Sequence, residues 1–272
     1  MPKALLIFSK APVVGITKTR LTVQRGGTLT PEQAAALYEA CLLDVMATGA
    51  TALERCRADG QEYDLLVSCS PAEECPLLLK TLNRLPDWAR PAHVLCDQGN
   101  SFDEHMDDAV QQVLARGYAA VVVIGGDLPM LQPETIQQAF HWLDRLNGPR
   151  GALVLAPCQE GGVSLVGLTG ETPFSFRGAF YNPAGVTALE ALVEKAATAD
   201  IPLALLETIS DVDYPVDLAS LIPTLQAMTY AAEFQAGIVV PQHTLNLVAK
   251  LGLAARAYPE EAVRGVLESR PE

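Results

Sequence analysis

Four charged residues in separate loops are the first candidates for chemistry: Lys18, Arg20, Asp127 and Asp213. Lysine and arginine side chains donate charge-assisted hydrogen bonds to phosphate oxygens. Aspartate oxygens are ligands that Mg²⁺ and Mn²⁺ accept, and such an ion bridges phosphates in turn. The four residues therefore predict an enzyme site for a nucleotide diphosphate or triphosphate, with Mg²⁺ or Mn²⁺ as cofactor held by Asp127 and Asp213.

The two cations belong to a basic loop, residues 9–21, which follows the first apolar run of the chain. Exposed amides and cationic side chains in such a loop can hold a polyphosphate. It is not a Walker loop, because no G-K-[ST] follows its glycine. A solvated surface loop is the alternative. The candidate nucleotide-binding residues are Ser9, Lys10, Gly15, Lys18, Thr19 and Arg20, with Ser68 from the second expected strand.

The two aspartates lie in short acidic motifs. Asp127 belongs to a Gly-Gly-Asp-Leu-Pro turn after the most strand-like run of the sequence. Asp211 and Asp213 alternate along an extended segment, so their carboxylates share one face. Each motif has a structural alternative: a local turn hydrogen bond for Asp127, and an acidic helix N-terminus ahead of Pro215 for the pair.

A fourth motif, Glu160-Gly161-Gly162, contains a carboxylate beside paired glycines. Glycines let a ligand approach the backbone closely, so Gly161 and Gly162 are candidates for binding an acceptor. Glu160 is then the candidate general base. A hairpin turn between two strands explains the same glycines without any ligand.

Alternating strand and helix patterns place these loops on an α/β fold. Apolar runs predict strands at 3–8, 63–69, 92–96, 119–124, 152–156, 164–168 and 203–206. Capping patterns at 30–33, 70–73 and 101–104, and prolines at 133, 183, 241 and 259, predict the helix starts between and after them. Such alternation indicates a mostly parallel mixed sheet flanked by helices. Ligands of such sheets bind beyond the carboxyl ends of the strands, where the charged loops are expected.

Composition restricts the partners. The net charge of -13 disfavours nucleic acid and anionic membrane as partners. The first apolar run is too short for a signal-peptide core, so we expect a cytoplasmic protein. The six cysteines have no C-x-x-C spacing and the four histidines form no H-E-x-x-H, so we expect reduced, buried thiols and no zinc hydrolase.

Five segments together resemble a family of GT-A-type nucleotide-diphospho-sugar transferases, glycosyltransferases of which some are linked to arsenosugar biosynthesis. They are 8–15 (FSKAPVVG), 18–21 (KTRL), 123–131 (VIGGDLPML), 160–162 (EGG) and 211–218 (DVDYPVDL). The resemblance covers residues 4–218. It implies a GT-A fold, a metal-dependent transferase, a nucleotide-sugar donor and a small-molecule acceptor.

The chain departs from the family pattern on the expected acceptor side. Val163, Ser164 and Leu165 follow the Gly-Gly where the family usually has aromatic residues. Tyr214 stands where threonine is common, and Val216 where glutamate is common. These differences bear on the acceptor more than on the nucleotide.

Two other functions stay open. Phospholactate-type guanylyltransferases share the Lys-Thr-Arg-Leu loop and the Asp-Leu-Pro turn, and residues 173–178 (PFSFRG) resemble their Phe-x-Phe-Gly segment. A nucleotidyltransferase joining an NTP to a phosphorylated acceptor is therefore the alternative. A non-catalytic nucleotide-binding module is a third possibility, although it gives no reason to keep Lys18, Arg20, Asp127 and Asp213 together.

The chain divides, on this interpretation, into a transferase-like domain at 1–228 and a helical C-terminal extension at 229–272. The extension lies outside the resemblance. Its apolar positions include Leu245, Val248 and Leu251, and they need burial either on the domain or in a homodimer.

Overall fold

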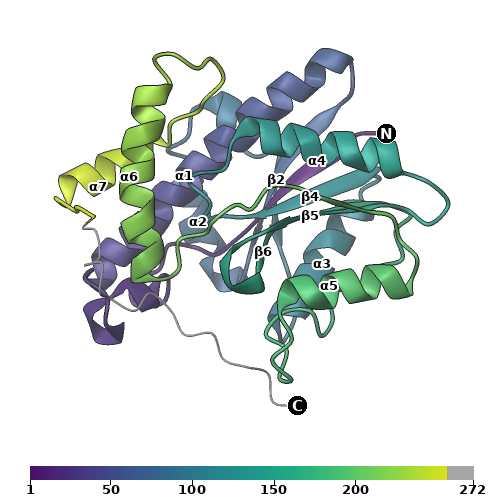
Figure 1. Cartoon of the computed structure of the whole chain (residues 1–272), viewed down its shortest axis with the longest axis horizontal. Helices are drawn as coiled ribbons and strands as arrows, with labels where there is room; N and C mark the ends of the chain where they lie inside the picture. The colour runs from purple at the N-terminus through teal and green to yellow at the C-terminus, as the bar shows by residue number, and fades with distance from the viewer. Residues whose placement is uncertain (256–272) are drawn as a thin grey trace, which may run out of the picture.

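A seven-stranded sheet forms the centre of the computed structural model, which describes residues 1–255 (Figure 1). The strands lie in the order β3-β2-β1-β4-β6-β5-β7, and only β6 runs antiparallel to its neighbours. Their bounds are β1 Lys3–Ser9, β2 Tyr63–Cys69, β3 His93–Cys96, β4 Ala120–Gly125, β5 Leu153–Pro157, β6 Val163–Thr169 and β7 Leu203–Leu205. The predicted mostly parallel mixed sheet is confirmed.

Helices cover both faces of the sheet. Their bounds are α1 Pro31–Cys56, α2 Cys75–Leu82, α3 Phe102–Leu114, α4 Pro133–Leu146, α5 Ala188–Thr198, α6 Pro215–Ala231 and α7 Gln242–Lys250. Apolar side chains of α1, α2 and α4 pack on one face, and those of α3 and α5 on the other. The central strands are therefore buried on both sides and consist of continuous apolar runs, as in β1 and β4.

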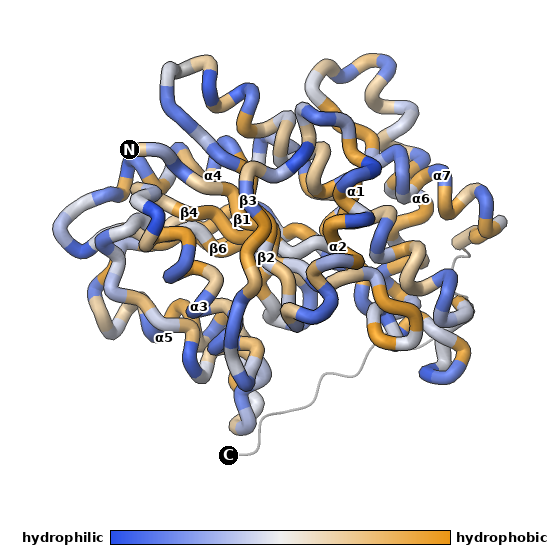
Figure 2. Tube along the Cα trace, turned by 180° about the vertical axis from the view of Figure 1, so that it is seen from behind, coloured by the Kyte–Doolittle hydropathy of each residue, from blue (hydrophilic) through white to orange (hydrophobic). Residues whose placement is uncertain are grey.

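Hydropathy follows this layering. In Figure 2 the strands β1, β2, β4 and β6 form an apolar centre, and polar segments lie mainly on the outer turns. One helix of the described residues, α1, is long and apolar enough to cross a membrane by length and composition. However, 78% of its most apolar stretch is buried inside the fold, which is the pattern of a core helix.

Helix starts agree with the prediction at Thr30, Ser101, Pro133 and Pro241, and they depart from it at two other places. The Thr30 hydroxyl and the Gln33 side chain form the expected capping box at α1. Ser101 caps α3, but the carboxylate of Glu104 reaches the backbone N–H of Asn100 instead of Ser101. The helix expected at 70 begins at Cys75, after a 3₁₀ turn, and the one expected at 183 begins at Ala188.

The last two helices pack together on the outer side of α1 (Figure 1). The carboxylate of Asp44, in the middle of α1, accepts hydrogen bonds from the backbone N–H groups of His243 and Thr244 at 3.0 and 2.7 Å. It therefore caps the start of α7. The predicted boundary at residue 228 falls within α6, and the division into two units stays a prediction. The helix expected at 259–267 lies outside the described residues.

Candidate functional site

The sheet brings the basic loop and the Asp127 turn together at the carboxyl ends of two neighbouring strands. β1 pairs with β4 in parallel, so that Phe8 lies opposite Gly125. The basic loop leaves β1 one residue later, and the Asp127 turn leaves β4 at the same edge. This is the edge where open α/β sheets bind their ligands.

Lys18, Arg20, Asp127 and Asp213 form one charged cluster at this edge. The Lys18 ammonium lies between two carboxylates, with Nζ 2.5 Å from Asp127 Oδ2 and 2.6 Å from Asp213 Oδ1. Arg20 Nη1 lies 2.8 Å from the second oxygen of Asp213. The four residues that the sequence selected for chemistry are therefore in direct contact, although 195 positions separate Lys18 from Asp213.

Burial and charge act in opposite directions on this cluster. Burial alone lowers the pKa of Lys18, but the charges of Asp127 and Asp213 outweigh it, and the net pKa is raised. Burial raises the pKa of Asp213, but Lys18 and then Arg20 outweigh it, and the net pKa is lowered. The ammonium and this carboxylate therefore stay ionised at neutral pH.

Asp211 lies beside the cluster without a cation of its own. Its pKa is raised to about 7, first by burial and then by the negative charges of Asp127 and Asp213. The Nε2 of Gln159 donates to its Oδ1 at 2.7 Å. The site thus contains three carboxylates close together, of which Lys18 and Arg20 compensate two.

Two neighbouring features hold the Asp127 carboxylate and the basic loop in place. A Cβ at Gly125 would lie 2.8 Å from Asp127 Oδ1, so glycine leaves the space into which this carboxylate folds back. The Tyr38 hydroxyl accepts a hydrogen bond from the backbone N–H of Lys10 at 2.9 Å, and the Lys18 ammonium lies 5.8 Å from the centre of the Tyr38 ring. Tyr38 of α1 therefore contacts the loop at both Lys10 and Lys18 and helps to hold it in place.

The acidic segment is fixed by the first turn of α6. The carboxylate of Asp217 accepts hydrogen bonds from the backbone N–H groups of Asp213 and Tyr214 at 3.0 and 2.6 Å. The helix-cap role considered for the acidic pair is thus performed by Asp217, and Asp213 is left to face the cations. The Arg20 guanidinium lies 4.9 Å from the centre of the Tyr214 ring, so the residue that departs from the family pattern helps to place Arg20.

The loop between β5 and β6 reaches the acidic segment through Gln159. Glu160, the candidate base, is exposed and has a left-handed backbone with φ of 60°. A Cβ at Gly161 would lie 2.7 Å from the Thr187 side chain, and one at Gly162 would lie 2.4 Å from the sulfur of Cys158. Packing of the hairpin on its own chain therefore accounts for both glycines, and their acceptor role stays a prediction.

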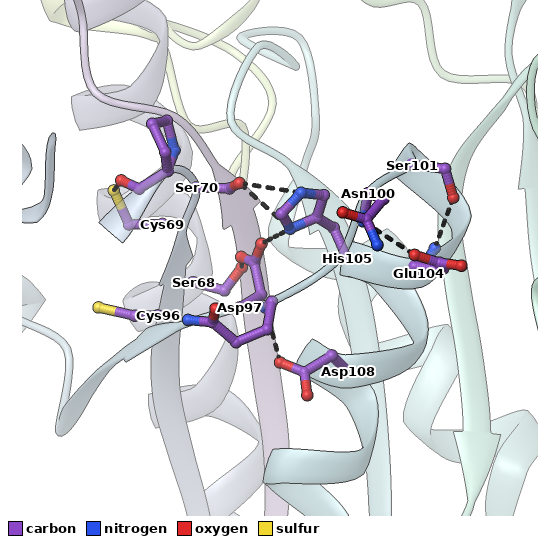
Figure 3. Close-up of polar contacts among 12 residues, drawn as sticks. Ser68, Cys69, Ser70, Cys96, Asp97, Asn100, Ser101, Glu104, His105 and Asp108 are labelled. Carbon is purple, nitrogen blue, oxygen red and sulfur yellow. Dashed lines mark hydrogen bonds and ion pairs between the residues drawn. The ribbon is translucent and has the colours of Figure 1, made fainter. Parts of the chain in front are cut away.

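A second polar cluster lies at the ends of β2 and β3: Ser68, Ser70, Asp97 and His105 (Figure 3). The fully buried Asp97 carboxylate accepts from Ser68 Oγ at 2.5 Å and lies 2.7 Å from His105 Nδ1. Ser70 Oγ lies 3.2 Å from the same ring nitrogen and 3.4 Å from Nε2. Asp97 therefore orients the Ser68 hydroxyl and the His105 ring at the carboxyl edge of the sheet, to which β1 also leads.

Other residues predicted to bind nucleotide are distributed along the same edge. The buried Ser9 hydroxyl donates to the backbone oxygen of Ser68 at 2.9 Å and so joins β1 to β2. The side chain of Lys10 is exposed, as is Gly15 at the loop tip. The backbone oxygen of Thr19 accepts from the hydroxyl of Thr22, which closes a tight turn beside Arg20.

Sequence reasoning missed five residues with contacts in this region: Tyr38, Asp97, His105, Gln159 and Tyr214. Asp97 follows an expected strand as Asp127 does, so its position carried a usable signal. Tyr38 and Gln159 act through packing and hydrogen bonds to distant segments, for which the sequence offers no local sign. A pocket of about 260 Å³ adjoins the site, lined by residues 130–132, Thr135 and residues 207–210.

The two cluster carboxylates suit a divalent ion, because they already converge on one cation, the Lys18 ammonium. Within residues 1–255 no group of three or more His, Cys, Asp or Glu side chains is arranged to hold a metal ion. Magnesium in such sites commonly takes one or two carboxylates together with phosphate oxygens of the substrate. Asp127 and Asp213 match that donor set.

Comparisons with known proteins bear on the fold. Residues 53–183 match a family model described as "Uncharacterized protein conserved in bacteria (DUF2064)". The structure is similar to that of a "putative nucleotide-diphospho-sugar transferase" from Desulfovibrio desulfuricans G20, with 25% identity and a TM-score of 0.67 over 91% of this chain and 97% of that one. The chain has the nucleotide-diphospho-sugar transferase-like fold. The fold expected from the sequence resemblance is therefore confirmed.

Lower similarity extends to other structures. Rv0371c from Mycobacterium tuberculosis H37Rv has 17% identity and a TM-score of 0.42 over 82% of this chain and 97% of that one. A cytidylyltransferase from Leptospira borgpetersenii serovar Hardjo-bovis has 12% identity and a TM-score of 0.46 over 92% of this chain and 94% of that one. A search of curated proteins gives no match.

Proposed function

We propose that the protein is a metal-dependent glycosyltransferase that uses a nucleoside diphosphate sugar as donor. One observation carries the proposal: Lys18, Arg20, Asp127 and Asp213 converge at the carboxyl edge of the sheet. The structural likeness to a protein described as a nucleotide-diphospho-sugar transferase supports a transferase acting on a nucleotide. The side chains present are those that a diphosphate with a divalent ion requires.

Each residue of the cluster has a role in this proposal. Asp127 and Asp213 would hold Mg²⁺ or Mn²⁺, which supplies positive charge beside the diphosphate leaving group. Lys18 and Arg20 donate hydrogen bonds to its oxygens. The acceptor hydroxyl forms a bond to the anomeric carbon as the bond from that carbon to the diphosphate breaks. The hydroxyl proton passes to a base, for which exposed Glu160 is the candidate.

The charges on the acceptor side favour glycosyl transfer over nucleotidyl transfer to a phosphorylated acceptor. Residues 151–176, which contain β5, β6 and the loop between them, include no lysine or arginine. Glu160 and Asp211 contribute negative charge there instead. A phosphorylated acceptor requires cations at its binding site, whereas an acceptor hydroxyl requires a carboxylate base. The acceptor proposed here is therefore a small molecule without phosphate.

The Asp127→Ala variant tests the metal role. Binding of nucleoside diphosphate sugars is measured by calorimetry with and without Mn²⁺, for the wild type and the variant. We expect Mn²⁺ to strengthen binding to the wild type and to have no effect on Asp127→Ala. Asp87→Ala, at an exposed aspartate, is the matched control and should behave as the wild type.

The donor screen separates the two chemistries. A donor sugar that is released from its diphosphate only in the presence of an acceptor supports glycosyl transfer. Pyrophosphate release from an NTP in the presence of a phosphorylated acceptor would instead assign nucleotidyl transfer to the site.

A homodimer and the cytoplasmic location stay predictions, which sedimentation velocity and fractionation of the source cells would test.

A further inference from the structure

The position of Lys18 is unusual for a residue that is to bind phosphate. Its side chain is 7% exposed, and its Nζ contacts Asp127 and Asp213 instead of pointing outward. Its backbone is left-handed, with φ of 52°, which residues other than glycine seldom adopt. The neighbouring turn of Thr19–Leu21 follows directly, so the strained backbone aims the ammonium into the acidic site.

The ammonium and a divalent ion compete for the same two carboxylates. Nζ lies 2.5 Å from Asp127 Oδ2 and 2.6 Å from Asp213 Oδ1. The ammonium therefore occupies the space in which a metal ion would contact the same two oxygens. Oxygen atoms that coordinate Mg²⁺ lie about 2.0–2.1 Å from the ion, so no room remains for both cations between the same oxygens. The two occupants exclude each other.

We propose that Lys18 occupies the cation position between Asp127 and Asp213 in the nucleotide-free protein, and that it yields this position to a divalent ion only when a nucleotide diphosphate arrives. This inference rests on the function proposed above, because it takes the two aspartates as the metal ligands. It adds that metal and nucleotide bind as one coupled event, with Lys18 as the exchanging part.

The exchange follows from the charges around the site. A buried ammonium that leaves two carboxylates needs another anion, because an unpaired buried charge is strongly unfavourable. The diphosphate is the anion that arrives with the metal, and Lys18 can transfer its hydrogen bonds to it. Arg20 keeps its ion pair with Asp213 and its contact with the Tyr214 ring during the exchange.

The exchange is tested by Mn²⁺ binding without nucleotide, measured from the electron paramagnetic resonance signal of free Mn²⁺. The Lys18→Met variant vacates the position, and we expect it to bind Mn²⁺ at least about tenfold more tightly than the wild type, within the usual range of coupling between sites. Lys80→Met removes a lysine charge from an exposed position of α2, outside the site, and should match the wild type. Equal affinities of Lys18→Met and the wild type would overturn the exchange.

A nucleoside diphosphate gives the complementary measurement. It should raise the Mn²⁺ affinity of the wild type about tenfold or more beyond that of the free Mn²⁺–nucleotide complex, and that of Lys18→Met much less. Phosphate oxygens that coordinate the ion also couple the two ligands, so the role of Lys18 is read from the comparison of the wild type with a folded variant. Lys18→Ala is the second variant, which keeps the comparison possible if Lys18→Met folds poorly. Coupling of the same size in the wild type and in either variant would refute the role of Lys18.

The double variant Lys18→Met/Asp127→Asn separates failure of the exchange from failure of the proposed function. If it binds Mn²⁺ as tightly as Lys18→Met, the ion is not held by Asp127, and the metal site itself is wrong. If it loses the binding while Lys18→Met equals the wild type, the metal site stands and the exchange fails. The exchange is supported when Lys18→Met gains affinity and the double variant loses it.

Discussion

The buried Asp44 carboxylate offers a sharp test of how the last helices are attached. Asp44 is 4% exposed and accepts from the second and third N–H groups of α7, those of His243 and Thr244. Asp44→Ala leaves both groups without this acceptor, one of them at Thr244, which is fully buried. Each unsatisfied buried group costs about 1–3 kcal/mol.

Removing the carboxylate also has a favourable component. Burial raises the pKa of Asp44, so holding its charge inside the protein is itself unfavourable. We therefore expect Asp44→Ala to lower the free energy of unfolding by about 2–3 kcal/mol at pH 7, less than the sum of two full penalties. Asp44→Asn keeps one acceptor oxygen and should lose about half as much.

Urea denaturation followed by circular dichroism measures this loss. With a slope of about 2 kcal/mol/M, a loss of 2 kcal/mol moves the midpoint down by about 1 M. Glu54→Ala, at an exposed position of the same helix, should change stability by no more than about 0.5 kcal/mol. An unchanged midpoint for Asp44→Ala would refute the reasoning. A separate transition at lower urea concentration would show that α7 unfolds independently of the rest of the fold.

Three further predictions concern the site. Gly125→Ala brings a Cβ to 2.8 Å from Asp127 Oδ1, so the carboxylate must move, and calorimetry should show Mn²⁺-dependent nucleotide binding weakened by about tenfold. The pKa of Asp211 is raised from 3.8 to about 7, first by burial, so the folded protein binds this proton more tightly than the unfolded chain. The free energy of unfolding should therefore decrease as the pH rises from about 4 to 7. Asp211→Asn should reduce this decrease in melting scans with EDTA. In Gly161→Ala the new Cβ would lie 2.7 Å from the Thr187 side chain, and the alanine would have to adopt a φ of 71°. The free energy of unfolding should therefore decrease by about 1–3 kcal/mol, which a lower melting temperature would report.

Local patterns in the sequence predicted most of the architecture. Buried strands of a parallel sheet appear as continuous apolar runs, and β1 and β4 were predicted within one residue of their observed ends. The antiparallel course of β6 was not predicted, because an apolar run carries no sign of strand direction. The start of α5 was placed at Pro183 instead of Ala188, since a proline marks a turn as readily as a helix start.

The candidate site was predicted in its members but not in its contacts. Residue types and the strand-end rule selected Lys18, Asp127 and Asp213, whereas only the folded chain reveals that the ammonium lies on the carboxylates. Charge alone suggested that each cation faces a phosphate. Gln159 and Tyr214 were not assigned to the site, because an amide or a ring acquires such a role only from the segment packed against it.

The long separations within the charged cluster have a consequence for how the protein matures during synthesis. Lys18 leaves the ribosome long before Asp213, and 195 positions lie between them. A nascent chain ending after α4 already contains Lys18 and Asp127, but it lacks the segment that contributes Asp213 and orients Arg20. Domains are made N-terminal end first, at about 5–20 residues per second, so the site is completed at least several seconds after its first residue is made. On the proposed function, nucleotide binding therefore reports a late step in the assembly of the fold, and chains truncated before Asp211 should not bind nucleotide.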